Sequence, residues 1–184
     1  MSEIGAPPPR PSTARLSAAP LAALRDLPRP RAVAVSFWCW LVASLLVGAS
    51  IAVGSTRIED MRAEFARLAG IGDPEATQAT IDRVADASVL VVIGTGGLLG
   101  VLGLLLAGPM RAGRGWARFC LAVVAVLALV YAVFVTTAVT EEMLGDLRVP
   151  VAAGLLAFAA TATVAAVCTY LPGTREWFHR PKGL

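Results

Sequence analysis

Four long stretches without a charged side chain divide the sequence into membrane-length segments. They occupy positions 32–56, 87–110, 119–140 and 149–174. A helix of about 20 apolar residues crosses the roughly 30 Å hydrocarbon core of a bilayer, and each stretch is longer than that. The pattern therefore predicts an all-α protein whose main domain, 33–171, is a four-transmembrane-helix bundle. The expected spans are about 33–54, 87–107, 118–140 and 150–171.

The connection between the first two spans, 55–86, is long and has a helical pattern of its own. Apolar residues recur at helical spacing from Ile58 to Leu68, with charged residues between them. Gly70 to Pro74 interrupts this pattern, and Asp73 is placed to cap a second helix that runs into span two. We expect spans one and two to continue outward as an antiparallel helical hairpin. A locally packed loop is the alternative.

Small residues recur along one face of several spans. In span two they follow 4-3-4 spacing, which places Gly96, Gly100, Gly103 and Ala107 on one side of the helix. Helices in membranes approach most closely where side chains are small, so this face is a predicted helix-packing site. Similar stripes are Ser44, Gly48 and Ala52 in span one, and Ala153, Ala157, Ala160 and Val164 in span four.

Composition supports a membrane protein and the charges predict its orientation. Hydrophobic residues make up 57% of the chain, and charged residues make up 16% against about 25% in soluble domains. The segments before span one, between spans two and three, and after span four hold 11 basic and 3 acidic residues. The other two connections hold 5 basic and 10 acidic residues. The positive-inside rule then predicts a multi-pass plasma-membrane protein with both termini in the cytoplasm.

The net charge of +3 does not indicate nucleic-acid binding, because the basic residues gather beside the spans. Positions 1–32 are rich in Pro, Ala and Arg, and they predict a disordered cytoplasmic tail. A docking tail is the alternative there, since Pro8 to Pro11 offers a PxxP-like surface. Positions 172–184 carry Trp177 and Phe178 beside cations, which is typical of a cytoplasmic interfacial tail.

The sequence offers little for catalysis or for a bound cofactor. Ionisable carboxylates and amines are missing from all four spans, which argues against a proton-coupled pump. Cys39, Cys120 and Cys168 lie in three different spans, and His179 stands by itself in the tail. The outer acids, such as Asp60 and Glu64, are too few on one face for a hard cation, which prefers six or more oxygens. We expect no catalytic residue, no cofactor and no metal.

A short basic loop between spans two and three is the one candidate ligand contact. Arg111, Arg114 and Arg118 lie within eight positions, with Trp116 among them. An anionic leaflet attracts such cations, and a Trp ring seats at the headgroup level. We expect these four residues to contact anionic lipids. The simpler alternative is that the arginines only set the orientation.

The same loop carries a resemblance to a known group of proteins. The run from Met110 to Arg118, the Tyr170-Leu171-Pro172 edge before Trp177-Phe178, and the Pro-rich head before an aromatic span are its motifs. With them the chain resembles small four-span integral membrane proteins of actinobacteria. The resemblance implies a plasma-membrane location and a four-span fold, and it implies no reaction.

Two functions from different classes remain open on this basis. The first is a non-enzymatic accessory or scaffold component of a cell-envelope membrane complex. It is suggested by the small-residue faces and the outer hairpin, and its partners would be membrane lipids with membrane proteins or further copies of the chain. The alternative is a small transporter or permeation protein for a small or lipidic molecule, since hydroxyl groups are present in every span. A continuous hydroxyl-lined cavity would favour transport, and a closed Ala/Gly seam would favour a scaffold.

Overall fold

The computed structural model describes residues 31–171 and Thr174, and this part of the chain is all α-helical apart from short turns. Almost all of the expected tails, 1–32 and 172–184, lies outside the described residues. The elements in chain order are α2 (Arg31–Ser55), α3 (Ile58–Gly72), α4 (Gln78–Arg111), α5 (Gly115–Ala138), α6 (Glu141–Leu144), the 3₁₀ turn η1 (Gly145–Leu147) and α7 (Arg148–Thr169).

Four segments are long and apolar enough to cross a membrane. They are Arg31–Ser55, Gln78–Arg111, Gly115–Ala138 and Glu142–Thr169. Each overlaps one of the four spans expected from the sequence, and the third and fourth end two residues earlier than expected, at Ala138 and Thr169. The protein is a multi-pass membrane protein.

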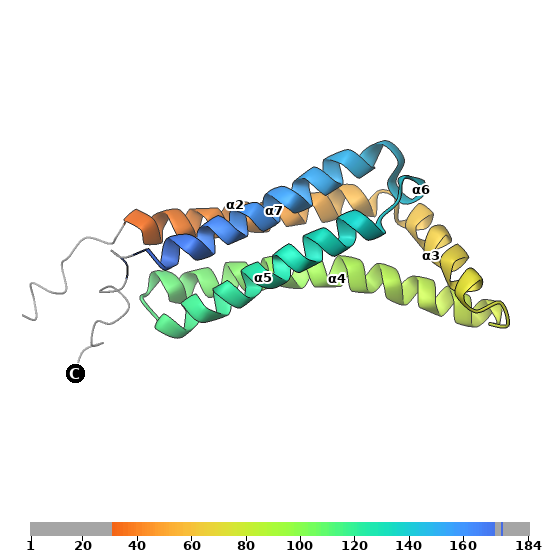
Figure 1. Ribbon diagram of the computed structural model, residues 1–184, viewed down its shortest axis with the longest axis horizontal. Helices are drawn as coiled ribbons and strands as arrows, with labels where there is room; N and C mark the ends of the chain where they lie inside the picture. The colour runs from red at the N-terminus through yellow and green to blue at the C-terminus, as the bar shows by residue number, and fades with distance from the viewer. Residues whose placement is uncertain (1–30, 172–173, 175–184) are drawn as a thin grey trace, which may run out of the picture.

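The four long helices form an antiparallel bundle in which each helix has two main neighbours. Helix α2 packs against α7 and α4, and α5 packs against the same two helices. Figure 1 shows the start of α2, the end of α7 and the α4–α5 turn at one end of the bundle, with α3 and α6 at the other. We call these the turn end and the α3 end. The basic α4–α5 turn and the acidic residues of α3 therefore lie at opposite ends of the bundle.

Proline and glycine explain why two helix boundaries differ slightly from the expected ones. Pro109 lies inside the last turn of α4, and the helix ends two residues later at Arg111, before Gly113 adopts a φ of 74°. Glycine takes this left-handed conformation without a Cβ clash. Pro150 is the third residue of α7. The first four N–H groups of a helix have no acceptor within it, so the missing N–H of Pro150 does not remove a helical hydrogen bond.

The bundle interior is built around a few large side chains between many alanines. Trp40, Phe158 and Leu121 are fully buried, each from a different helix. The small face of span four does not point into the bundle: Ala153, Ala160 and Val164 are exposed, and the opposite side of α7 packs inward. Gly48 and Ala52 of span one are exposed as well. Because Ala and Gly occur around the whole circumference of both helices, a stripe of small residues does not identify the packed side.

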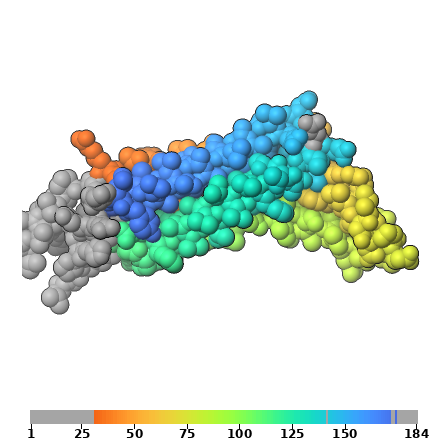
Figure 2. All heavy atoms as spheres, in the orientation of Figure 1, coloured from red at the N-terminus to blue at the C-terminus, as the bar shows by residue number. Residues whose placement is uncertain are grey.

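The segment between spans one and two differs from the expected pair of continuous helices. Helix α2 ends at Ser55, because Ser55 and Thr56 donate hydroxyl hydrogen bonds to Ala52 and Val53 O and the next amides form tight turns. A separate helix, α3, then packs along the start of α4, which runs unbroken into the bundle. Figure 2 shows α3 at the end of the bundle away from the α4–α5 turn.

Candidate functional site

The predicted packing face of α4 lies between two neighbouring helices of the same chain. A Cβ at Gly100 would lie 2.7 Å from Cγ1 of Val47, and one at Gly103 would lie 2.7 Å from Cε3 of Trp40. Both neighbours belong to α2. A Cβ at Gly96 would instead lie 2.5 Å from the hydroxyl of Tyr131 in α5.

The fourth member of that face, Ala107, is fully buried. Because the three glycines have no side chain, Val47, Trp40 and Tyr131 can pack directly against the backbone of α4. The face serves contacts within one chain, a question that the sequence had left open.

Three hydroxyl groups join neighbouring helices through carbonyl oxygens. Ser36 donates to Ala165 O at 2.7 Å, which joins α2 to α7. Ser44 donates to Gly100 O at 2.9 Å, and so α2 is also joined to α4. Tyr131 donates to Val92 O at 2.8 Å and joins α5 to α4. Hydrogen bonds between membrane helices add to their association, typically by about 0.6 kcal/mol each.

Most other span hydroxyls bond to the backbone of their own helix. Thr136, Thr137, Thr161 and Thr163 each donate to a carbonyl three or four residues earlier. Their hydrogens are therefore already engaged, and they do not converge on an interior channel. Among the described buried side chains, the indole N–H of Trp40 has no hydrogen-bond acceptor.

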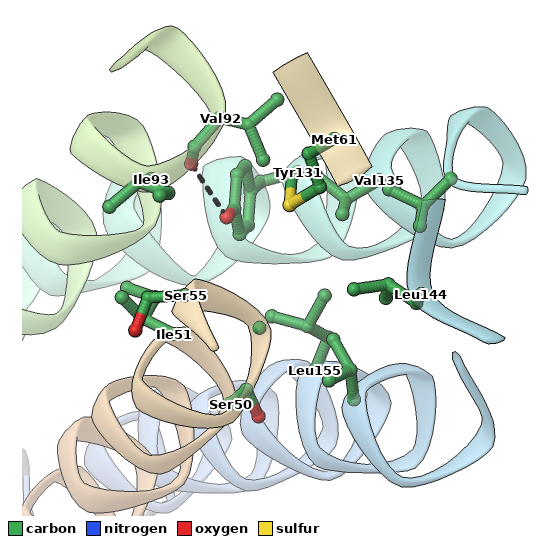
Figure 3. Close-up of a pocket in the computed structure, with 13 residues that line it drawn as sticks. Ser50, Ile51, Ser55, Met61, Val92, Ile93, Tyr131, Val135, Leu144 and Leu155 are labelled. Carbon is green, nitrogen blue, oxygen red and sulfur yellow. Dashed lines mark hydrogen bonds between the residues drawn. The ribbon is translucent and has the colours of Figure 1, made fainter. Parts of the chain in front are cut away.

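An apolar cavity of about 40 Å³ lies between the helices at the α3 end. Figure 3 shows its lining side chains, among them Ile51, Val92, Tyr131, Val135 and Leu155, with Met61 of α3 beside them. This volume has room for about three water-sized groups.

The polar atoms in the cavity wall already have partners. Tyr131 bonds to Val92, and Ser50 and Ser55 bond to carbonyls of their own helix. The side chains from α5 and α7 are buried, whereas Ile51 and Val92 on the α2–α4 side are partly exposed. A pocket with such an apolar lining favours hydrocarbon over water.

Helix α3 is held over this end by apolar contacts of Met61 and Phe65 and by two ion pairs to other elements. Met61 is buried in the main hydrophobic core. Arg62 pairs with Asp86 of α4 at 2.6 Å. Arg67 bonds to both carboxylate oxygens of Glu64, at 2.7 and 2.5 Å, and contacts Glu142 beyond α5 at 3.4 Å.

The α3 cluster changes the acidity of its members. The hydrogen bond from Arg67 lowers the pKa of Glu64 below its ordinary value, against the opposite effect of desolvation. The same bond raises the pKa of Arg67. Both groups therefore stay charged over a wider pH range than usual. Of the acids of α3, Glu59 and Asp60 are exposed, whereas Glu64 is buried.

The turn end carries the residues predicted to contact anionic lipids. The guanidinium of Arg111 lies 4.8 Å from the ring centroid of Phe37, and that of Arg118 lies 4.6 Å from the ring centroid of Tyr170. Arg114 is the exposed residue just before α5. Trp116 is 53% exposed in the first turn of that helix. The structure thus places all four residues at one end of the bundle.

Sequence reasoning missed the aromatic partners of these arginines. Phe37 and Tyr170 belong to α2 and to the end of α7, far from residues 111–118 along the chain. No local pattern predicts such a pairing, because it depends on which helices become neighbours. The docking of Met61 and the hydrogen bond of Tyr131 were missed for the same reason.

The described residues do not contain a group of three or more His, Cys, Asp or Glu side chains close enough to hold a metal ion. Cys39, Cys120 and Cys168 are all free thiols. No protein-family model, curated protein or solved structure matches this chain.

Proposed function

We propose that the protein is a non-enzymatic accessory or scaffold component of a membrane complex in the cell envelope. In this proposal it lies in the plasma membrane with both termini in the cytoplasm. The turn end, with Arg31, Arg111, Arg114 and Arg118, then faces the cytoplasm, as the positive-inside rule requires. The α3 end and its acidic residues face the outside.

The closed interior of the bundle is the observation that carries this proposal. Trp40, Leu121, Ala128 and Phe158 are fully buried between the helices. The hydroxyls of Ser36 and Ser44 bond to backbone carbonyls of neighbouring helices. A bundle packed in this way is suited to be a rigid scaffold for neighbouring membrane proteins. Its described part leaves no polar path for a substrate along the bundle axis.

The tip formed by α3 and the start of α4 supports a docking role outside the membrane. Leu68, Ile71 and Val84 are 44%, 65% and 46% exposed, and all three lie outside the expected spans. Large apolar side chains in contact with water are a common feature of protein-interaction surfaces. We define this tip surface by Leu68, Ile71 and Val84, and we propose that an envelope protein or another copy of the chain covers it.

The experiment compares proteins that are cross-linked to the tagged chain in intact membranes. Leu68→Ser/Ile71→Ser removes most of the apolar tip surface, and Glu75→Ser/Arg83→Ser alters two exposed polar residues nearby as the matched control. We expect at least one cross-linked protein to fall about tenfold with the apolar variant and to be unchanged with the control. A wild-type chain that stays monomeric, with no cross-link sensitive to the tip, would contradict the proposal.

A small transporter for a lipidic molecule is the second candidate, and the apolar cavity is what favours it. The cavity is partly exposed toward the α2–α4 side, where a hydrocarbon group from the membrane could enter. The test is translocation of a fluorescent short-chain phospholipid across vesicles that contain the purified protein. Faster translocation than in empty vesicles, slowed by the cavity-filling variant Leu155→Trp, would support transport. Equal rates in the two kinds of vesicle would exclude phospholipid transport.

A further inference from the structure

Two arginines at the turn end rest on aromatic rings that come from other helices. Arg111 of α4 lies over Phe37 of α2, and Arg118 of α5 lies over Tyr170 at the end of α7. All four bundle helices therefore meet in these two contacts. Phe37 is half-buried and Tyr170 is 46% exposed, so both rings lie at the rim of the bundle.

A guanidinium that lies over a ring directs its N–H groups outward in its own plane, along the ring and not into it. The attraction is about 0.5–1 kcal/mol at an exposed site, and it restricts a side chain that otherwise has many rotamers. An arginine held in this way loses less freedom when it binds a ligand. Its fork of N–H groups matches the oxygens of a phosphate.

The charges around this end favour an anionic ligand. In the described part of the chain, the charged side chains at the turn end are Arg31, Arg111, Arg114 and Arg118, while the acids lie in α3, the α3–α4 connection, the start of α4 and the segment 141–146. The ion pairs that bridge helices, Arg62–Asp86 and Arg67–Glu142, belong to the α3 end. The described residues of the turn end thus carry an excess of positive charge.

The position of these arginines relative to the membrane favours a lipid as the source of the anion. The arginines stand directly at the ends of apolar spans, where lipid phosphates lie. Trp116 is exposed in the first turn of α5, in the position that suits a ring at the headgroup level. An anionic leaflet adds about 1 kcal/mol of attraction for each nearby cation.

We propose that Phe37 and Tyr170 hold Arg111 and Arg118 in a preset binding site for the phosphate of an anionic phospholipid, completed by Arg114. The site goes beyond the proposed scaffold role and does not depend on it. The arginines contact the phosphate, and the two aromatic residues act as positioning residues. Orientation by charge alone predicts no effect of the rings, because removing them leaves the net charge unchanged.

The experiment is native mass spectrometry of the detergent-purified full chain with phosphatidylglycerol and phosphatidylcholine in competition. Phe37→Leu/Tyr170→Leu keeps every charge and removes both rings. Phe119→Leu is the matched control, since Phe119 is an aromatic residue 68% exposed at the same end of α5. We expect the preference for phosphatidylglycerol to fall about tenfold in the double variant and to stay within about twofold in the control.

Two further variants and a competitor complete the design. Arg111→Lys keeps the charge but loses the planar fork, so it should lower the preference as the ring variants do. The single variants Phe37→Leu and Tyr170→Leu, each checked for an unchanged melting temperature, replace the double variant if it does not fold. An unchanged preference in the ring variants, with a loss only in Arg111/Arg114/Arg118→Gln, would overturn the preset site. Displacement of the lipid by millimolar inorganic phosphate would overturn the choice of a lipid.

Discussion

Gly96 leaves the space that the hydroxyl of Tyr131 occupies between α4 and α5. A Cβ at position 96 would lie 2.5 Å from that oxygen and 2.9 Å from Cζ of the ring. The hydroxyl uses this space to reach Val92 O at 2.8 Å. One glycine therefore permits an interhelical hydrogen bond that its own helix accepts, one turn earlier.

We expect Gly96→Ala to destabilise the bundle by about 1–3 kcal/mol, because the new methyl group displaces the Tyr131 hydroxyl from its acceptor. Thermal unfolding in detergent measures the loss. In Gly96→Ala the Tyr131 hydroxyl has already lost its acceptor, and adding Tyr131→Phe removes that hydroxyl and part of the clash. Tyr131→Phe should therefore cost less stability in the Gly96→Ala variant than in the wild type. Strictly additive losses would show that the two residues do not interact.

Gly100→Leu should destabilise the bundle by about 2 kcal/mol or more, because its side chain would enter the space of Val47 Cγ1. Leu105→Ile is the control on the same helix. Leu105 is 64% exposed toward the lipid, so the exchange should change stability by less than about 0.5 kcal/mol. Equal melting temperatures for both variants and the wild type would refute the packing role of Gly100.

The ion-pair cluster on α3 predicts how stability depends on pH. The pKa of Glu64 is lowered from its ordinary value of 4.5, first by the hydrogen bond from Arg67. Ionised Glu64 therefore contributes fully to the stability of the fold above the pKa that it has in the unfolded chain, near 4.5. This stabilisation is lost as the pH falls through the lower pKa that Glu64 has in the folded protein.

The melting temperature of the wild type should accordingly fall below about pH 4.5, and Glu64→Gln should show a smaller fall. Glu75→Gln, at an exposed position outside this cluster, is the matched control and should follow the wild type. Identical pH profiles for Glu64→Gln and the wild type would mean that the Glu64–Arg67 pair does not stabilise the docked α3. Hydrogen exchange of the α3 amides would locate the change.

The orientation can be tested with fused reporters. A reporter after Leu184 should be active in the cytoplasm, and one inserted near Gly72 should be active outside, because the basic turn end is expected to stay inside. An insertion at Gly113, in the α4–α5 turn, should match the C-terminal fusion. An external signal from the C-terminal fusion would overturn the model with both termini inside.

The four spans could be predicted from the sequence because hydrocarbon solvates uncharged helices and excludes charged side chains. Each uncharged stretch contains the greater part of one helix of the bundle. The 4-3-4 spacing of Gly96, Gly100 and Gly103 also placed these residues on one side of α4, since helical periodicity is a local property. Local chemistry was therefore enough for the helices and for the faces within each of them.

The tertiary structure decided which faces meet and what they hold. Alanines surround α7 on every side, so only its packing against α2 and α5 determines which of them are buried. The docking of Met61 and the rings of Phe37 and Tyr170 beneath two arginines depend on contacts between residues distant in the chain. Such contacts are set by the shape and neighbours of whole helices, and the periodicity of a single helix carries no information about its neighbours.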